Sequence, residues 1–304
     1  MIKFFEDVLK SKNISYRRGV LTALLCSFRI GGIASLLIEP DCTLELIEAV
    51  RLCHNAKAPY YIVGRGTNLL FPDEDIKTVL ISTARLQGMR ERSDGIFAGC
   101  GTPLILLAYH SARRGFGDLV FAGGIPGSLG GGVFMNAGAY GGALSDVIKS
   151  VCVYDPLEDK IKTYFNNQLS FSYRKSIFQE KPWVILSADL LLKSHGDPTE
   201  LLQRIRRQNR ARSAAQPLDH PSAGSCFLRP APQLFAARIL DELGLKGLQI
   251  GGAAVSQKHA GFVVNLGGAT ANDVMQLIEK IQKIVQKERG ILLQPELRFV
   301  PSGK

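Results

Sequence analysis

The segment GGIPGSLGGGVFMNAGAYGG, residues 123–142, restricts this chain more than any other part of its 304 residues. It holds nine glycines in twenty positions and no charged side chain. Each glycine loses more backbone entropy on folding than any other residue, so this composition disfavours a packed helix or strand. We therefore expect a segment whose main chain comes close to another surface, because glycine leaves no side chain in the way.

Two shorter glycine turns precede this segment. IVGRGTNLL (62–70) and AGCGTPL (98–104) each place G-x-G at the end of a strand-like run. Leu69 and Leu104 stand where a dinucleotide-binding G-x-G-x-x-G has its third glycine, and no G-K-[ST] of a P-loop follows. Main-chain N–H groups in glycine turns bind phosphates. Three such turns favour a nucleotide cofactor with a diphosphate, in a non-Rossmann geometry, over a glycine-rich structural loop.

Strand and helix signals alternate through the first two thirds of the chain. Residues 43–59 predict a helix that begins at Thr43 and ends before Pro59. A second helix is predicted up to Gly115, with Thr102 as its cap and Pro103 in its first position. Strand-like runs, with β-branched residues and turn residues at their ends, lie at 60–64, 78–83, 95–101, 150–155 and 183–192.

The sequence pattern changes near residue 197. A basic helix containing RIRRQNRAR (204–212) is followed by a loop rich in proline and small residues. Apolar residues then recur at helical spacing until Gly290 stops them, and LLQPELRFV (292–300) predicts a closing strand. The spaced apolar residues are Val274, Leu277, Ile278, Ile281, Ile284 and Val285. We expect an α/β domain before a boundary near residue 197 and a smaller α+β domain after it.

The chain is basic, with a formal net charge of +10. Such a balance is typical of proteins that bind nucleic acid, an anionic membrane surface or anionic small molecules. Residues 204–212 form either a solvated helix face or an anion-binding one. The chain has no aromatic-basic interleaving and no zinc-finger spacing, so we expect no nucleic-acid partner.

Composition also bears on the compartment and on metals. The six cysteines are scattered without a C-x-x-C pair, as in a reduced, cytoplasmic protein. Arg29 and the glycines after it interrupt the most apolar stretch, so we expect no membrane insertion. No spacing of His, Asp or Glu indicates a metal site.

Seven motifs follow one another along the chain: RIGG (29–32), VGRGTNLL (63–70), the glycine segment, FSYRKS (171–176), PSAGSCFLRP (221–230), KHAGFVVN (258–265) and LLQPELRFV (292–300). In order and spacing, these motifs resemble those of the UDP-N-acetylenolpyruvoylglucosamine reductases, FAD enzymes of peptidoglycan precursor synthesis. The resemblance covers nearly the whole chain, and the chain's length is typical of the family's shorter branch, which lacks an extra tyrosine-bearing loop.

The resemblance implies an α+β fold and a domain division. A vanillyl-alcohol-oxidase or PCMH-type FAD-binding domain would span 1–197, as two subdomains of about 1–86 and 87–197. A smaller α+β substrate-binding domain would span 198–304. The implied protein is cytoplasmic, serves cell wall biogenesis and with it cell shape and cell division, and needs no obligate protein partner.

The resemblance also implies the cofactor and the residues that bind it. FAD is bound without a covalent link, and NADPH is the hydride donor. The turn at 64–69 wraps the FAD diphosphate, while parts of the glycine segment line the flavin and its ribityl chain. The implied cofactor-binding residues are Gly64, Arg65, Gly66, Thr67, Asn68, Leu69, Ile125, Pro126, Gly127, Ser128, Gly131, Gly132, Asn136 and Ala137.

The implied reaction reduces the enolpyruvyl group of UDP-N-acetylglucosamine enolpyruvate to give UDP-N-acetylmuramate. Hydride addition leaves negative charge beside the substrate carboxylate, which a guanidinium can bind through two parallel hydrogen bonds. By resemblance, Arg174 holds this charge, Ser225 donates the proton and Glu296 assists that transfer. Cys226 is interpreted as a packing residue, because strand alternation directs it away from Ser225.

The substrate-binding residues implied by the resemblance are Tyr173, Arg229, Lys258 and His259. Two departures concern UDP binding. Leu228 and Arg229 replace the usual Lys-Asn pair, and Gly261 replaces an asparagine. Arg229 can still meet a diphosphate.

Two other functions stay open. One is a flavoenzyme of the same superfamily that oxidises another small molecule, and the other is a nucleic-acid-binding or scaffolding protein on a retired enzyme fold. Flavin absorbance of the purified protein separates the flavoenzymes from the scaffold.

Overall fold

The computed structural model describes residues 2–193 and 195–303. The chain divides into two compact units. The first unit consists of Met1–Arg18, Leu36–Arg65 and Val79–Ala211. The second unit consists of Gly19–Ser35, Gly66–Thr78 and Arg212–Lys304.

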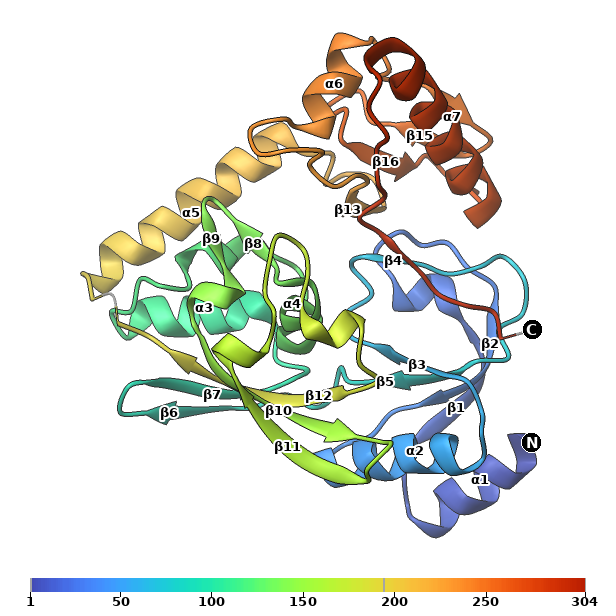
Figure 1. The fold of residues 1–304 in the computed structure, drawn as a ribbon, viewed down its shortest axis with the longest axis vertical. Helices are drawn as coiled ribbons and strands as arrows, with labels where there is room; N and C mark the ends of the chain where they lie inside the picture. The colour runs from blue at the N-terminus through green and yellow to red at the C-terminus, as the bar shows by residue number, and fades with distance from the viewer. Residues whose placement is uncertain (1, 194, 304) are drawn as a thin grey trace. The chain divides into compact units, whose positions relative to one another are not determined.

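One sheet has the strand order β1 (Tyr16–Leu21), β2 (Ile33–Ile38), β5 (Val79–Ser82), β3 (Tyr60–Val63), of which β5 and β3 lie wholly in the first unit. Strands β2 and β3 both pair in parallel with β5, and helix α2 (Thr43–Asn55) provides the crossover that parallel strands need (Figure 1). The predicted helix at 43–59 and the predicted strands at 60–64 and 78–83 are confirmed. Helix α1 (Ile2–Ser11) precedes β1.

A second sheet, in the first unit, is antiparallel. In spatial order its strands are β11 (Lys160–Phe165), β10 (Ile148–Asp155), β12 (Val184–Leu191), β7 (Gly95–Gly99) and β6 (Met89–Arg92). Helices α3 (Leu104–Arg113) and α4 (Leu129–Met135) lie over one face of it (Figure 1). The predicted strands at 95–101, 150–155 and 183–192 are confirmed.

Helix α3 begins one residue later than predicted, so its N-cap is not Thr102. Pro103 is the N-cap in an extended conformation, and the first helical residue is Leu104. The Thr102 hydroxyl donates to the Gly88 carbonyl at 3.1 Å and accepts from the Gly88 N–H at 3.2 Å. Because this tertiary pairing uses the hydroxyl, Thr102 does not cap the helix.

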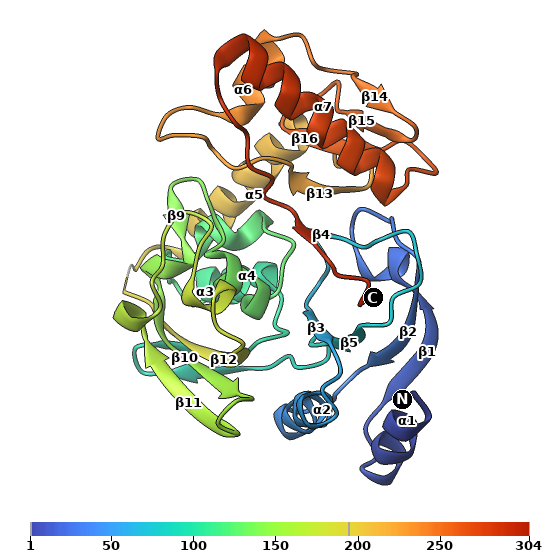
Figure 2. The same cartoon turned by 45° about the vertical axis from the view of Figure 1, so that its right-hand side comes forward.

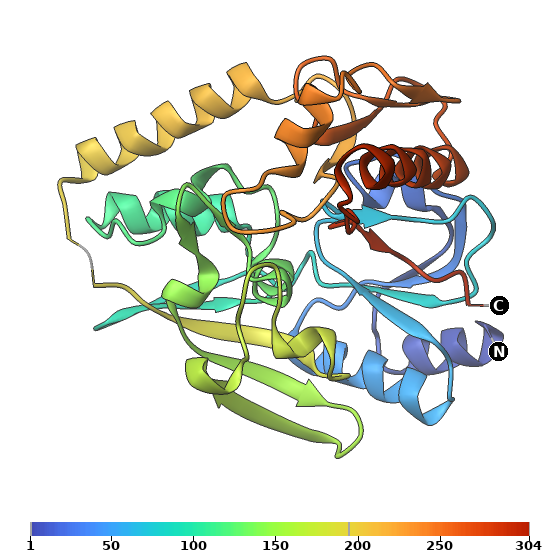
Figure 3. The same ribbon diagram turned by 45° about the horizontal axis from the view of Figure 1, so that its top comes forward.

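The predicted basic helix is confirmed as α5 (Pro198–Ala215). It lies beside α3 (Figure 3), and Asn209 Nδ2 donates to the Gly123 carbonyl at 3.1 Å. Only Leu201 and Ile205 of its described residues are buried. Arg204, Arg206, Arg207 and Arg210 are all exposed.

The second unit has a sheet with the order β13 (Ser222–Ser225), β16 (Phe262–Asn265), β15 (Ala253–Val255), β14 (Gln249–Ile250). Helix α7 (Ala271–Arg289) packs against β14 and β15 (Figure 2), and α6 (Ala236–Glu242) precedes β14. The predicted apolar stripe is confirmed, since all its members but the half-buried Ile284 are buried.

Side chains accept hydrogen bonds from the N–H groups at the start of α7, and a glycine ends the helix. Thr270 and Asp273 form a capping box, and Asp73 accepts from the N–H groups of Ala271 and Asn272 at 2.7 and 3.0 Å. Gly290, with φ of 67°, ends the helix in the left-handed conformation, as predicted.

The predicted closing strand at 292–300 is mostly wrong. Only β17 (Arg298–Phe299) is a strand, and it pairs in parallel with β4 (Leu69–Leu70). Before it, Pro295 has no N–H to donate to a ladder. The chain around Pro295 instead makes single contacts, as the isolated bridge with Phe227 shows.

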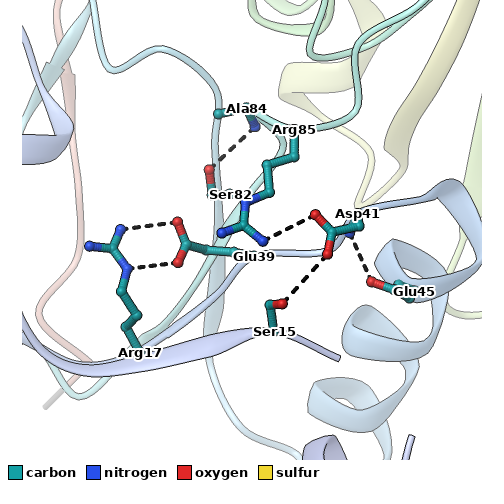
Figure 4. A network of polar contacts seen from close by, with 8 residues as sticks. All are labelled: Ser15, Arg17, Glu39, Asp41, Glu45, Ser82, Ala84 and Arg85. Atoms are coloured by element: carbon teal, nitrogen blue, oxygen red, sulfur yellow. Dashed lines mark hydrogen bonds and ion pairs between the residues drawn. The ribbon is translucent and has the colours of Figure 1, made fainter. Parts of the chain in front are cut away.

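A polar network holds surface loops of the first unit together (Figure 4). Arg17 donates to both carboxylate oxygens of Glu39, at 2.7 and 3.0 Å, and Arg85 donates to Asp41 at 3.0 Å. Exposed pairs of this kind contribute little to stability individually. Among the described helices, none combines the length and the apolar character needed to cross a membrane.

Candidate active site

The glycine-rich segment folds into more regular structure than its composition suggests. It contains α4 and the hairpin β8 (Gly138–Ala139) to β9 (Gly142–Ala143). The prediction that this composition disfavours a helix is therefore wrong for α4. Its glycines allow close packing: a methyl group at Gly132 would lie 2.7 Å from Leu144 Cδ1, and one at Gly130 would lie 3.0 Å from Cys100 Cβ.

One part of the segment is accessible to solvent. Residues 125–127, between the 3₁₀ helix η2 (Val120–Gly124) and α4, are half-buried or exposed. Gly131 is exposed, and among the described residues a methyl group there would approach only Ser128 Oγ, at 3.5 Å. No charged residue occurs between positions 119 and 145. The accessible part of the segment therefore carries no charged side chain of its own.

The two glycines of the GRGTN turn avoid clashes with other atoms of the protein. In the first unit, a methyl group at Gly64 would lie 2.7 Å from Ser128 Oγ, so this turn reaches the start of α4. In the second unit, Gly66 has φ of 63°, and its carbonyl accepts from Ser27 N–H at 3.1 Å. A Cβ at Gly66 would overlap the Leu25 carbonyl oxygen.

The second unit brings the segments of Ser225 and Glu296 together. Ser225 is the exposed last residue of β13, and the next residue, Cys226, is buried. The Glu296 N–H donates to the Cys226 carbonyl at 2.8 Å. Asn68 joins the same region, since its Nδ2 donates to the Glu296 carbonyl at 3.1 Å.

Cys226 is confirmed as a packing residue. Burial, with a smaller contribution from the Glu296 charge, raises the pKa of its thiol well above the usual range. A thiol held in its neutral form is a poor nucleophile.

Arg174, in the first unit, lies at the tip of a tight turn. Ser172 and Lys175 exchange both main-chain hydrogen bonds, at 3.2 and 3.1 Å, which leaves Tyr173 and Arg174 as the two tip residues. Arg174 Nη2 donates to the Gly138 carbonyl at 3.1 Å, and the guanidinium lies 5.1 Å from the Tyr173 ring centroid. The structure therefore places Arg174 and Tyr173 beside the glycine segment.

Comparison with known proteins identifies the family. The chain is 42% identical over 274 residues to the UDP-N-acetylenolpyruvoylglucosamine reductase of Caldanaerobacter subterraneus subsp. tengcongensis, covering 90% of both chains. The chain belongs to the UDP-N-acetylenolpyruvoylglucosamine reductase family. The enzyme of that name from Clostridium botulinum is 39% identical over 297 residues, covering 97% of this chain and 95% of the other.

Two family models and one solved structure agree with this assignment. The FAD binding domain matches residues 34–162, and the C-terminal domain of UDP-N-acetylenolpyruvoylglucosamine reductase matches residues 216–300. The crystal structure of the reductase from Thermus caldophilus covers 95% of this chain and 99% of its own, with 34% identity and a TM-score of 0.78. The predicted family and the predicted PCMH-type FAD-binding domain followed by a smaller domain are confirmed.

In this reductase, the predicted substrate-binding side chains of the second unit contact other parts of that unit. Arg229 lies over the Phe235 ring at 4.8 Å, and Lys258 Nζ donates to the Ser213 carbonyl at 2.7 Å. His259 Nδ1 accepts from the Gly261 N–H at 3.1 Å. Burial lowers the pKa of His259, so the imidazole is neutral near pH 7, as an acceptor must be.

A cleft of about 230 Å³ opens in the second unit. Of the predicted substrate-binding residues, Lys258 lines it, together with Asp219 and His220. Ser225 and Arg229 are not among its lining residues. Among the described residues, no cluster of His, Cys, Asp and Glu has the arrangement of a metal site.

Two residues outside the predicted set bond to main-chain carbonyls in this region, and one of them, Gln179, bonds to a predicted site residue. Gln179 donates from Nε2 to the Arg174 carbonyl at 2.9 Å, and the buried Ser176 donates to the Phe134 carbonyl at 2.7 Å. Asn68 and Asn136 were selected for the cofactor, yet their side chains bond to the protein: Asn136 Nδ2 donates to the Ser172 carbonyl at 2.9 Å. Position within FSYRKS-IFQ is the only sequence signal for Gln179.

Alanine substitutions at the neighbouring glycines Gly131 and Gly132 are expected to have opposite effects on stability and on FAD binding. Gly131→Ala has space within the protein, so we expect near-normal stability but weaker FAD binding. Gly132→Ala meets Leu144 and Leu104, at 2.7 and 2.9 Å, so we expect a loss of about 1–3 kcal/mol in the free energy of unfolding. Urea unfolding and flavin titration of both variants measure this difference. Full flavin affinity in Gly131→Ala would remove Gly131 from the cofactor site.

Proposed function

We propose that Arg174, Ser225 and Glu296 carry out the substrate half of this enzyme's reaction. As a member of its family, the protein is an FAD-dependent UDP-N-acetylmuramate dehydrogenase of peptidoglycan precursor synthesis. It uses NADPH to reduce the enolpyruvyl group of UDP-N-acetylglucosamine enolpyruvate. FAD, when bound, supplies the hydride transfer, so the protein's own residues have to bind, orient and protonate.

Arg174 binds the substrate carboxylate in this proposal. A guanidinium offers a planar fork of N–H donors that matches a carboxylate and keeps its charge at any working pH. The tight turn at 172–175 and the Gly138 carbonyl hold this side chain in place. The arginine therefore stabilises the negative charge that develops beside the carboxylate when hydride is added.

Ser225 donates the proton to the carbon next to the carboxylate. Its exposure at the end of β13 leaves the hydroxyl accessible, whereas Cys226 is turned into the core. Glu296 assists this transfer, and the hydrogen bond between Glu296 N–H and the Cys226 carbonyl supports the assignment, because it joins the two segments.

FAD is held without a covalent link by Gly64–Leu69, Ile125–Ser128 and Gly131–Ala137 in this proposal. The support is the uncharged, accessible part of the glycine segment at 125–127 and Gly131, and the reach of Gly64 to Ser128. Tyr173, Arg229, Lys258 and His259 contribute to the UDP-sugar site. The boundary near residue 197 separates the FAD-binding domain from the substrate-binding domain.

The exposed arginines of α5 serve polyanionic ligands such as NADPH and the UDP-sugar rather than nucleic acid, by raising their local concentration. The enzyme acts in the cytoplasm and needs no obligate protein partner. Tight, salt-dependent RNA or DNA binding that UDP-sugar leaves unchanged would contradict this assignment.

The decisive test follows the two half-reactions in a spectrophotometer. We expect purified protein to be yellow, NADPH to bleach it, and the enolpyruvyl UDP-sugar to restore the colour with formation of UDP-N-acetylmuramate. Bleaching without restored colour by this substrate would favour another flavoenzyme of the superfamily.

A further inference from the structure

Arg174 adopts a main-chain conformation that arginine rarely takes. Its φ is 57°, in the left-handed region, and it is the second tip residue of the turn closed by Ser172 and Lys175. Turns of this kind favour glycine or asparagine there, because a Cβ makes the conformation costly. The surrounding structure must therefore hold Arg174 in this conformation.

Gln179 bonds to the main chain of Arg174. It ends the 3₁₀ helix η5 (Ile177–Gln179), and its Nε2 donates to two carbonyls, Arg174 O at 2.9 Å and Phe134 O at 3.0 Å. A side-chain amide nitrogen has two hydrogens, so the two carbonyls use both, and the Met135 sulfur lies farther away at 3.9 Å. One side chain thus links the main chain of Arg174 to the C-terminal end of α4.

Ser172, on the other side of the turn, is also bonded to the C-terminal end of α4. Asn136, the C-cap of α4, donates from Nδ2 to the Ser172 carbonyl at 2.9 Å, and its Oδ1 accepts from the Ser145 N–H at 2.9 Å. Ser176 adds a bond from Oγ to the Phe134 carbonyl. Gln179 bonds both to this end of α4 and to the carbonyl of Arg174.

We propose that Gln179 is a positioning residue for Arg174: its amide holds the strained turn so that the guanidinium meets the substrate carboxylate. This inference rests on the proposed role of Arg174. Because the α4 segment is also assigned to the flavin, the clamp fixes the carboxylate-binding group relative to the cofactor site. A displacement of about 1 Å in such a group can reduce a rate about 100-fold.

The test replaces Gln179 with methionine, which has a similar length and no N–H group. We expect Gln179→Met to lower kcat/KM for the enolpyruvyl substrate by about 10- to 100-fold. The rate of flavin bleaching by NADPH should stay within about twofold of normal, because Arg174 serves only the substrate half. Ser176→Ala is the matched control: it removes a bond to the same Phe134 carbonyl and should leave kcat/KM within a few-fold of normal.

A binding measurement separates positioning from a general loss of structure. UDP-N-acetylmuramate carries a carboxylate that UDP-N-acetylglucosamine lacks, so calorimetric affinities for both report the carboxylate contact. We expect Gln179→Met to weaken only UDP-N-acetylmuramate, and to have little further effect in an Arg174→Ala background. Equal weakening of both ligands, or a full effect in that background, would overturn the proposal.

The same measurement distinguishes failure of the clamp from failure of Arg174. If Arg174→Ala keeps the preference for UDP-N-acetylmuramate, the proposed role of Arg174 is wrong. The proposed role of Gln179 is then wrong too, because it depends on that of Arg174. If Arg174→Ala abolishes the preference while Gln179→Met retains it, the clamp alone is wrong.

Discussion

Ser225→Ala is expected to slow the reduction of the enolpyruvyl substrate by about 10⁴-fold or more, the upper end of what loss of a general acid costs. Only the substrate half of the reaction needs a proton delivered to carbon, and the carbanion that accepts it is strongly basic. Bleaching of the flavin by NADPH should therefore proceed at a near-normal rate. Stopped-flow absorbance, recorded separately for the two halves, measures both rates.

Two further variants test the role of the hydroxyl. Ser225→Cys should recover part of the rate, because a thiol can donate a proton from a similar position. Ser222→Ala, on the same strand β13, is the control and should leave both halves nearly unchanged. If Ser225→Ala slowed both halves equally, the serine would organise the site, and its role as the acid would be lost.

Gly66→Val is expected to yield protein without bound FAD. A Cβ at this position would overlap the Leu25 carbonyl oxygen, and a φ of 63° is strained for a β-branched residue. Both effects displace the turn that we assign to the diphosphate. The ratio of flavin to protein absorbance measures the loss, and circular dichroism reports whether the variant folds.

Gly268→Val is the control, because it introduces main-chain strain at a positive φ without a steric clash. Gly268 also lies in the second unit, with φ of 66°, but a Cβ there has no neighbour within 4 Å among the described residues. We expect this variant to be destabilised yet fully yellow. A folded, fully yellow Gly66→Val protein would contradict the placement of the cofactor.

Local patterns were sufficient for most of the elements. Helix α7 has an apolar stripe and a terminal glycine, adjacent in sequence, and it forms where these two signals predict. Strands β3, β5, β10 and β12 also follow their β-branched runs. In the glycine segment, composition does not show whether a glycine accommodates a ligand or a neighbouring side chain. Gly132 accommodates Leu144 and Leu104, whereas Gly131 is open.

The sequence by itself determined the family, the cofactor and the candidate catalytic residues, since their motifs are contiguous and ordered along the chain. Tertiary structure decided what each side chain contacts. Thr102 bonds Gly88 instead of capping α3, Pro295 limits β17, and Gln179 clamps a left-handed Arg174. These contacts form when main-chain groups that are distant in sequence come close together in the fold. Every residue has a main-chain carbonyl, so the sequence does not show which one will accept a hydrogen bond. Hydrogen bonds to main-chain atoms therefore appear only once the chain is folded.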